Sequence, residues 1–285
     1  MLSAALRRAD MGLCRSLRTL LSYRLPLLMR IEQDQSHSAT LCDTATVSVK
    51  PSHFLRTMTS GTAQTTINRS EVIDIEIALH GLPGCLRLPP NPRGVIVFAH
   101  GSGSSRNSAR NAYVAEALRE LGFATLVFDL LSEQEAENRA DVFDIPLLAE
   151  RTVSACKWAS AANWTRGLPV GLFGASTGAA AALQAAAELG DQVSALVSRS
   201  GRPDFAAALE EVRMPTLLIV GGSDRDILGL NRAALAVLAG PKKLQIVPNA
   251  THRFSEPGTL DAVAAAAAEW FGHYCRQSED KEERR

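Results

Sequence analysis

The feature that most constrains the fold is a regular alternation of short apolar segments with longer segments of helical spacing, which begins near residue 71. Residues 94–99 and 123–128 are apolar almost throughout, as expected of strands buried on both faces of a sheet. Strands that alternate with helices predict a parallel sheet, and right-handed crossovers place the helices on both of its faces. We therefore predict an α/β fold with a doubly wound, mostly parallel sheet.

The predicted elements follow one another closely, apart from residues 132–144, which we expect to form an acidic loop. The first strand alternates apolar and acidic side chains and pairs with the second through a turn at 81–84. The predicted strands are 72–79, 85–88, 94–99, 123–128, 168–173, 193–197, 216–220 and 243–247, and the predicted helices are 109–121, 145–162, 177–189, 206–211, 228–238 and 257–273.

The first 57 residues differ in charge from the rest of the chain. They hold eight Lys or Arg and four acids, a net charge of +4, so the remainder carries −4 because Lys+Arg and Asp+Glu are both 30. We expect residues 1–57 to be a basic, unstructured leader, from a misassigned start or a targeting segment such as a mitochondrial presequence. Residues 58–275 then form the folded domain and 276–285 a charged, solvated tail.

Composition also limits the partners. A net charge of zero gives no global field that would attract nucleic acid or an anionic membrane, so we expect neither. The five cysteines are widely spaced and include no CxxC pair, which favours reduced thiols in a cytoplasmic protein. No metal and no organic cofactor is implied. The oligomeric state is left open, a homodimer included.

One segment carries the pattern of a nucleophile. Gly174-Ala-Ser-Thr-Gly178 lies between a predicted strand and a predicted helix, the setting that the G-x-S-x-G elbow requires. Glycine on both sides of Ser176 allows a tight turn that exposes its hydroxyl at a helix N-terminus, where negative charge is favoured. The alternative is that Ser176 only caps the helix.

A serine hydroxyl needs a base, and the base needs an acceptor that fixes its tautomer. Among the six histidines, only His252 lies between the last predicted strand and the last predicted helix, whereas we expect His100 to pack under its loop. Asp224 follows the strand 216–220 and is our candidate acid, with Asp204 and Asp226 as the alternatives. The order Ser, Asp, His is that of the α/β-hydrolases.

The developing oxyanion needs donors that are in place beforehand. We expect the backbone amide of Thr177, directly after the nucleophile, to be one of them. The second should come from the glycine-rich loop that begins at His100, with Ser102 as the candidate and Gly101 or Gly103 as alternatives.

Together these segments resemble the dienelactone hydrolase-like branch of the α/β-hydrolase superfamily. The strings at 173–183, 197–204 and 217–224 are similar to a bacterial subgroup whose members are sometimes fused or adjacent to a phosphoribosyltransferase. The resemblance implies an α/β-hydrolase domain. It departs from the family pattern at Ser176, because dienelactone hydrolases proper carry a cysteine nucleophile, and this points to ordinary ester or acyl hydrolysis.

Two further expectations concern the substrate. Arg199 and Arg202 can hold a substrate carboxylate as bidentate donors, or they can pair with Asp204 and surface acids. Only residues 200–215 separate two core strands at the place where lids are commonly inserted, so we expect no large lid domain and a small, water-soluble substrate.

The sequence therefore predicts a serine hydrolase that cleaves a carboxylic ester, or a related acyl bond, through an acyl-serine intermediate. A thioesterase, peptidase or perhydrolase using the same three residues is one alternative. A non-catalytic hydrolase fold that serves as a binding partner is the other.

Overall fold

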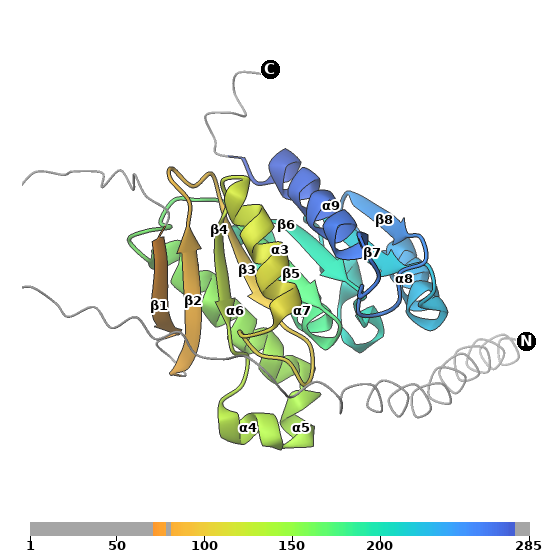
Figure 1. Ribbon diagram of the computed structural model, residues 1–285. Coiled ribbons are helices and arrows are strands. Elements are labelled where there is room, and N and C mark those ends of the chain that lie inside the picture. The colour runs from red at the N-terminus through yellow and green to blue at the C-terminus, as the bar shows by residue number, and fades with distance from the viewer. Residues whose placement is uncertain (1–70, 78–80, 277–285) are drawn as a thin grey trace, which may run out of the picture. The chain divides into compact units, whose positions relative to one another are not determined.

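The computed structural model of the chain describes residues 71–77 and 81–276 (Figure 1). The predicted leader at 1–57 and residues 277–285 of the predicted tail lie outside the described residues. Within the described ranges the strands are β1 (Glu71–Ile77), β2 (Leu82–Leu88), β3 (Val95–Ala99), β4 (Ala124–Phe128), β5 (Val170–Ala175), β6 (Val193–Arg199), β7 (Thr216–Gly221) and β8 (Lys242–Val247).

The eight strands form one sheet in the order β1-β2-β4-β3-β5-β6-β7-β8. Strand β2 runs antiparallel to its neighbours β1 and β4, and all the other neighbouring strands are parallel. The predicted doubly wound, mostly parallel sheet is therefore confirmed. The helices are α3 (Ala109–Glu120), α4 (Glu133–Glu137), α5 (Arg139–Val142), α6 (Ile145–Ala161), α7 (Thr177–Leu189), α8 (Arg225–Val237) and α9 (Thr259–Tyr274).

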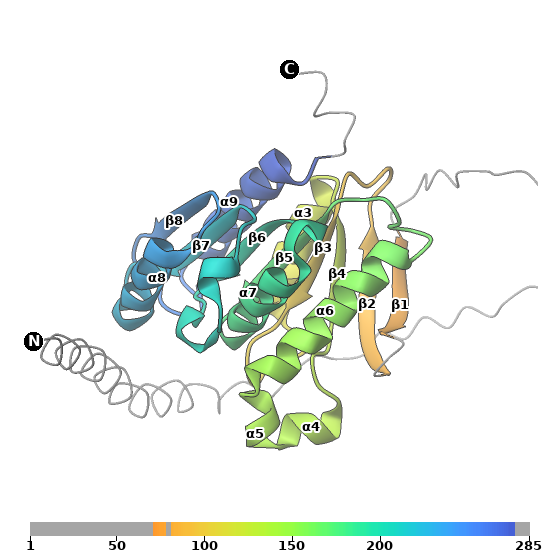
Figure 2. The same ribbon diagram turned by 180° about the vertical axis from the view of Figure 1, so that it is seen from behind.

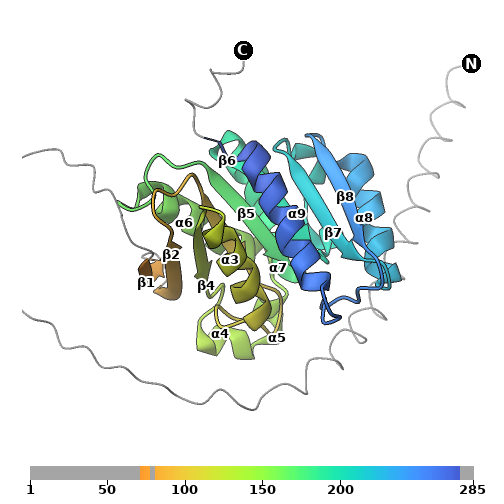
Figure 3. The ribbon, with the colours of Figure 1, turned by 45° about the horizontal axis from the view of Figure 1, so that its top comes forward.

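Helices cover both faces of the sheet. Helices α3 and α9 lie on the face seen in Figures 1 and 3, whereas α6, α7 and α8 lie on the opposite face, seen in Figure 2. Strands β3, β4 and β5 are buried along their whole length between these two layers, which explains their continuous apolar sequences.

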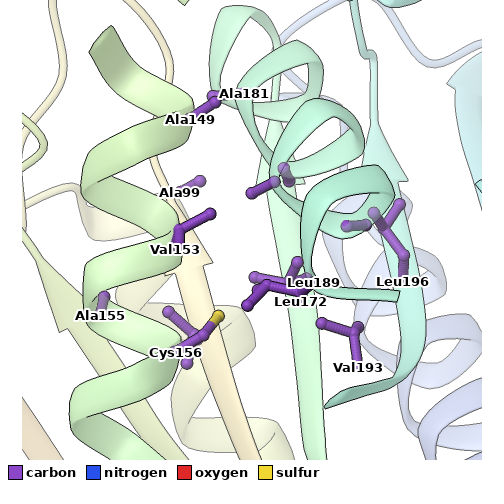
Figure 4. Close-up of a cluster of buried hydrophobic side chains, with 14 of the residues drawn as sticks. Ala99, Ala149, Val153, Ala155, Cys156, Leu172, Ala181, Leu189, Val193 and Leu196 are labelled. Carbon is purple, nitrogen blue, oxygen red and sulfur yellow. The ribbon is translucent and has the colours of Figure 1, made fainter. Parts of the chain in front are cut away.

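Small side chains allow α6 and α7 to pack closely. Ala149, Val153 and Ala181 point into the space between the two helices (Figure 4), and each of these side chains is at most 4% exposed. Leu172 of β5 lies below them in the same hydrophobic cluster. The alanine-rich start of α7 is therefore held firmly on the sheet, which fixes the position of the residue that precedes it.

Two predicted connections are wrong in detail. Residues 132–144 are not a loop but contain α4 and α5, and a capping box between Ser132 and Glu135 stabilises the start of α4. The predicted helix 206–211 is absent, and two separate 3-10 turns stand in its place, η2 (Pro203–Phe205) and η3 (Leu209–Glu211). The reason is local: Ala206 is extended and Ala208 is left-handed, with φ of 60°.

The predicted turn at 81–84 is also shorter than expected, because β2 already begins at Leu82. A Cβ atom on Gly84 would lie 2.8 Å from the side chain of Ile75 and 3.0 Å from that of Phe128. The glycine therefore serves the close approach of β1, β2 and β4 rather than a turn.

The predicted absence of a large lid is confirmed, because residues 200–215 between β6 and β7 hold only η2 and η3. Helices α4 and α5 follow β4 and lie beside the N-terminal end of α6, at the carboxyl edge of the sheet (Figures 1 and 2). Arg151 of α6 binds Glu135 of α4 at 3.0 Å and holds this pair of helices there. No helix in the described ranges has the length and apolar character needed to cross a membrane.

Candidate active site

The site lies where the strand order reverses. From β3 the chain crosses to β4 on one side and later to β5 on the other side. The connections after β3 and β5 therefore lead to helices on opposite faces of the sheet, α3 and α7 (Figures 1 and 2). Ligands of open α/β sheets bind at such a point, beyond the carboxyl ends of the strands. The loops after β7 and β8 reach the same edge.

Ser176 occupies the sharp turn between β5 and α7. Its φ of 53° and ψ of −119° are unusual for a residue with a side chain. A Cβ atom on Gly174 would lie 2.5 Å from the Cα of Ala179, and one on Gly178 would lie 2.3 Å from the carbonyl oxygens of Ala99 and His100. Both glycines are therefore required by backbone contacts, and the elbow geometry is present as predicted.

The backbone on both sides of Ser176 is anchored by the next strand and its loop. The Ser176 amide donates to the carbonyl oxygen of Arg199 at 3.0 Å, and the Ser176 carbonyl oxygen accepts from the Arg202 amide at 3.1 Å. The side chain of Ser176 makes no capping hydrogen bond to α7. Its hydroxyl is thus available for another partner.

That partner is His252. The distance from His252 Nε2 to Ser176 Oγ is 3.2 Å, and His252 Nδ1 lies 2.7 Å from Asp224 Oδ2. With the proton on Nδ1, the ring donates to the carboxylate and its Nε2 can accept the proton of the serine hydroxyl. The structure therefore joins the three predicted residues in one hydrogen-bonded chain.

The alternatives to Asp224 are otherwise placed. The Asp204 carboxylate binds the Arg202 guanidinium through two hydrogen bonds of 2.8 and 2.9 Å, and Asp226 lies exposed in the first turn of α8. Asp224 occupies the N-cap position of α8, yet its side chain makes no capping bond there. Its carboxylate is directed to His252 instead.

The loops that carry Asp224 and His252 are bound to each other. The Ser223 amide donates to the Ala250 carbonyl oxygen at 3.0 Å, and a Cβ atom on Gly221 would lie 2.3 Å from that same oxygen. The position of the acid relative to the base is thus set by backbone contacts of the two loops.

The histidine loop is anchored on both sides of His252. Before the histidine, Thr251 donates from its amide and its hydroxyl to the Glu256 carboxylate at 3.1 and 2.6 Å. After it, Phe254 is only 2% exposed and packs in the core under α9. The imidazole is therefore held over Ser176.

His100 lies under its loop, as the sequence suggested. Its Nε2 accepts a hydrogen bond from the Leu130 amide at 3.0 Å, and its Nδ1 donates to the Gly101 carbonyl oxygen at 3.0 Å. Burial lowers the pKa of His100, which keeps the ring neutral and preserves these two bonds. A second contact ties the loop to the end of β4, because both the amide and the guanidinium of Arg106 bind the Asp129 carboxylate.

The two expected oxyanion donors lie close together. The Thr177 amide is at the first position of α7, where no acceptor is available within the helix. The Ser102 amide donates to the hydroxyl oxygen of Thr177 at 2.7 Å, and Thr177 is 3% exposed. This bond could not be predicted, because it joins residues 75 positions apart and leaves no local signal in the sequence.

The two candidate arginines differ in their surroundings. Arg202 binds Asp204 and stacks on the ring of Phe205 at 3.9 Å, so the pairing alternative holds for Arg202. Arg199 is 8% exposed, donates to Asn111 at 3.4 Å, and has no partner for Nε or Nη1 within the described residues. Its expected contact with a substrate carboxylate stays a prediction.

The environment of Arg199 also changes its ionisation. Burial is the main cause that lowers the pKa of Arg199 to about 10, and the positive charge of Arg110 is the second cause. Arg199 therefore stays charged at neutral pH. For metal binding, residues 71–77 and 81–276 contain no cluster of three or more His, Cys, Asp or Glu that could hold an ion.

A mostly parallel eight-stranded sheet, a serine elbow after β5 and the acid and histidine after β7 and β8 define the α/β-hydrolase class. Residues 82–275 match the model of the dienelactone hydrolase family, and the chain belongs to this family. It has the fold of the α/β-hydrolases.

Two solved structures illustrate the range of this similarity. The chain is 50% identical to the dienelactone hydrolase of Anabaena variabilis, with a TM-score of 0.69, and the match covers 73% of this chain and 99% of that one. An esterase domain from Rhodothermus marinus has the same fold at 22% identity and a TM-score of 0.56, with 73% and 100% covered.

Curated relatives from Mycobacterium tuberculosis, whose names describe a phosphoribosyl transferase, are 54% identical over 209 residues. That match covers 73% of this chain but only 47% of the relatives, so the chain spans about half of their length.

Proposed function

We propose that the protein is a serine hydrolase that cleaves a carboxylic ester, or a related acyl bond, of a small substrate through an acyl-serine intermediate. One observation carries the proposal: the hydrogen-bonded chain from Ser176 through His252 to Asp224. A hydroxyl, a neutral imidazole acceptor and a carboxylate in this order are the groups that activate a serine for attack on a carbonyl.

In the first step Ser176 Oγ attacks the carbonyl carbon while His252 Nε2 takes the hydroxyl proton. Asp224 holds the ring through Nδ1 and stabilises the imidazolium that forms. His252 then protonates the leaving group, and the C–O bond to that group breaks to give the acyl-serine. Water enters, gives a proton to His252 and attacks the acyl carbon. The bond from that carbon to Ser176 Oγ then breaks, His252 returns the proton to Oγ, and the acid leaves.

The negative charge on the carbonyl oxygen is held at the N-terminal end of α7. The Thr177 amide and the loop that contains Ser102 are the donors that we assign to it, and the helix dipole favours the charge. Each such donor lowers the barrier by about 3 kcal/mol.

The surroundings of the site bear on the size and the chemical class of the substrate. The short connection between β6 and β7 supports a site without a large cover, which favours a small, water-soluble ester over a long lipid. The name of the Anabaena variabilis relative suggests a lactone as one class to include. A thioester, a peptide and a peracid-forming acyl donor are the alternatives that a substrate panel separates.

The experiment that tests the proposal is labelling with a fluorophosphonate, followed by mass mapping of the modified peptide. We expect the label on Ser176, its loss in Ser176→Ala, and a strong decrease in His252→Ala. Ester turnover by Ser176→Ala should fall about 10⁴-fold or more. A folded protein that takes no label would instead support the non-catalytic binding protein.

A further inference from the structure

The side chain of Thr177 takes part in a contact that the proposed function does not use. Its hydroxyl oxygen accepts the hydrogen bond of the Ser102 amide at 2.7 Å, although that amide belongs to the loop expected to serve the oxyanion directly. The hydroxyl thus binds one of the two backbone donors that we assign to the oxyanion, and it belongs to the residue that carries the other. Thr177 is 3% exposed, so bulk water does not compete freely for the hydroxyl.

A hydroxyl that accepts one hydrogen bond still has its own proton to donate. Within residues 71–77 and 81–276, the Ser102 amide is the one hydrogen-bond partner of the Thr177 hydroxyl, and it is a donor. The O–H of Thr177 is therefore left without an acceptor. A buried donor of this kind costs free energy unless an acceptor arrives.

The substrate supplies such an acceptor. Its carbonyl oxygen must approach the Thr177 amide for Ser176 to attack the adjacent carbon, and this brings it to the residue that carries the hydroxyl. We propose that the Thr177 hydroxyl is a direct side-chain donor to the oxyanion, alongside the Thr177 amide. The Ser102 amide then acts through the hydroxyl, which it orients and polarises, because linked hydrogen bonds strengthen one another.

This inference rests on the proposed serine hydrolase mechanism and adds a side chain to it. In the competing arrangement, the hydroxyl occupies the oxyanion site only in the resting enzyme, and the oxyanion displaces it from the Ser102 amide. In that case the Ser102 amide contacts the oxyanion directly. Removing the hydroxyl has opposite consequences in the two arrangements, which makes them separable.

The test compares Thr177→Val, which keeps the shape and loses the hydroxyl, with Thr177→Ser, which keeps the hydroxyl. We expect Thr177→Val to lower kcat for a short activated ester about 10²-fold, as for other oxyanion donors, with KM within about twofold. The rate of fluorophosphonate labelling should fall in parallel, because the phosphoryl oxygen occupies the same site. Thr177→Ser should stay within about threefold of the parent.

A kcat for Thr177→Val that equals or exceeds that of the parent would overturn the inference and favour displacement by the oxyanion. If Thr177→Val does not fold, Thr177→Ala loses the same hydroxyl at a helix position where alanine is well tolerated. Thr152→Val is the matched control for a buried threonine: Thr152 donates to the Leu148 carbonyl oxygen at 2.8 Å within α6, away from Ser102, and its loss should leave kcat unchanged.

The outcome also separates this inference from the function on which it rests. If the parent is labelled at Ser176 and turns over esters, but Thr177→Val keeps full kcat, only the role of the hydroxyl is wrong. If the parent is neither labelled nor active on any acyl substrate, the proposed hydrolase function and the proposed role of the Thr177 hydroxyl fail together.

Discussion

At the scale of single residues, Arg199 lies in an environment that is unfavourable for a charged side chain. Its guanidinium is buried, Nε and Nη1 have no partner within the described residues, and Arg110 adds a second positive charge nearby. Arg151 is buried to a similar degree, but it binds the Glu135 carboxylate. A buried charge is normally tolerated because it is paired, so an unpaired one indicates a role that stability does not explain.

We predict that Arg199→Met raises the free energy of unfolding by about 1–3 kcal/mol, because an uncompensated buried charge is removed. The same change should lower kcat/KM for esters that carry a carboxylate more than for neutral esters, if Arg199 holds that group. Arg151→Met is the matched control and should lower stability, since it leaves Glu135 unpaired. Chemical denaturation and paired ester substrates measure the two effects, and a less stable Arg199→Met would contradict the first.

At the scale of elements, the loop after β3 depends on a neutral histidine. His100 accepts from the Leu130 amide through Nε2, and a protonated ring cannot accept there. Burial lowers the pKa of His100 below its usual value near 6.5, so the unfolded chain binds more protons than the folded chain in the window below that value. The contribution of His100 to stability is therefore present above about pH 6.5 and is lost as the pH falls through this window.

We predict that the unfolding temperature of the parent falls more steeply between pH 7 and pH 5 than that of His100→Gln. The amide oxygen of glutamine can accept from the Leu130 amide and does not titrate. The difference should approach about 1.4 kcal/mol per pH unit within the window between the two pKa values. Thermal unfolding at several pH values measures it, and parallel curves for the two proteins would contradict the assignment.

The elements also show which features a sequence can reveal. Helix α7 was predicted with its observed bounds, Thr177–Leu189, because the glycine elbow marks its start and a long apolar run fills it. Helices α4 and α5 were missed, since four or five residues are too few to show a helical period, and only Ser132 and Glu135 signalled a start.

The candidate site was likewise predictable only in part. Ser176, Asp224 and His252 could be chosen from the sequence because each directly follows a strand or lies in the loop after one, and carboxyl ends of parallel strands meet at one edge. The contacts that hold the surrounding loops in place could not be predicted from the sequence. The bond from Ser102 to Thr177 and the pairing of Arg106 with Asp129 join residues far apart in the chain, and neither has a local pattern.

At the scale of the whole molecule, one domain supplies both the core and the candidate site. Among the described residues, the two hydrophobic clusters and the chain of Ser176, His252 and Asp224 belong to the same sheet and its covering helices. The Anabaena variabilis structure is matched over 99% of its length by 73% of this chain, whereas the Mycobacterium tuberculosis relatives are matched over 47% of theirs. The same domain thus accounts for nearly all of one relative's chain and for about half of the others.

We therefore predict that a chain beginning at Met58 folds and works like the full chain, with the same unfolding temperature and the same kcat/KM for a short ester. The reason is that the hydrophobic clusters and the catalytic chain of hydrogen bonds that the structure describes are formed by residues between 71 and 276. A chain beginning at Val95 is the control: it lacks β1 and β2, whose residues Leu82, Leu86 and Leu88 are fully buried, and it should not fold. If instead the chain from Met58 unfolds several degrees earlier or loses turnover, residues 1–57 belong to the working domain, and the boundary expected from the sequence is wrong.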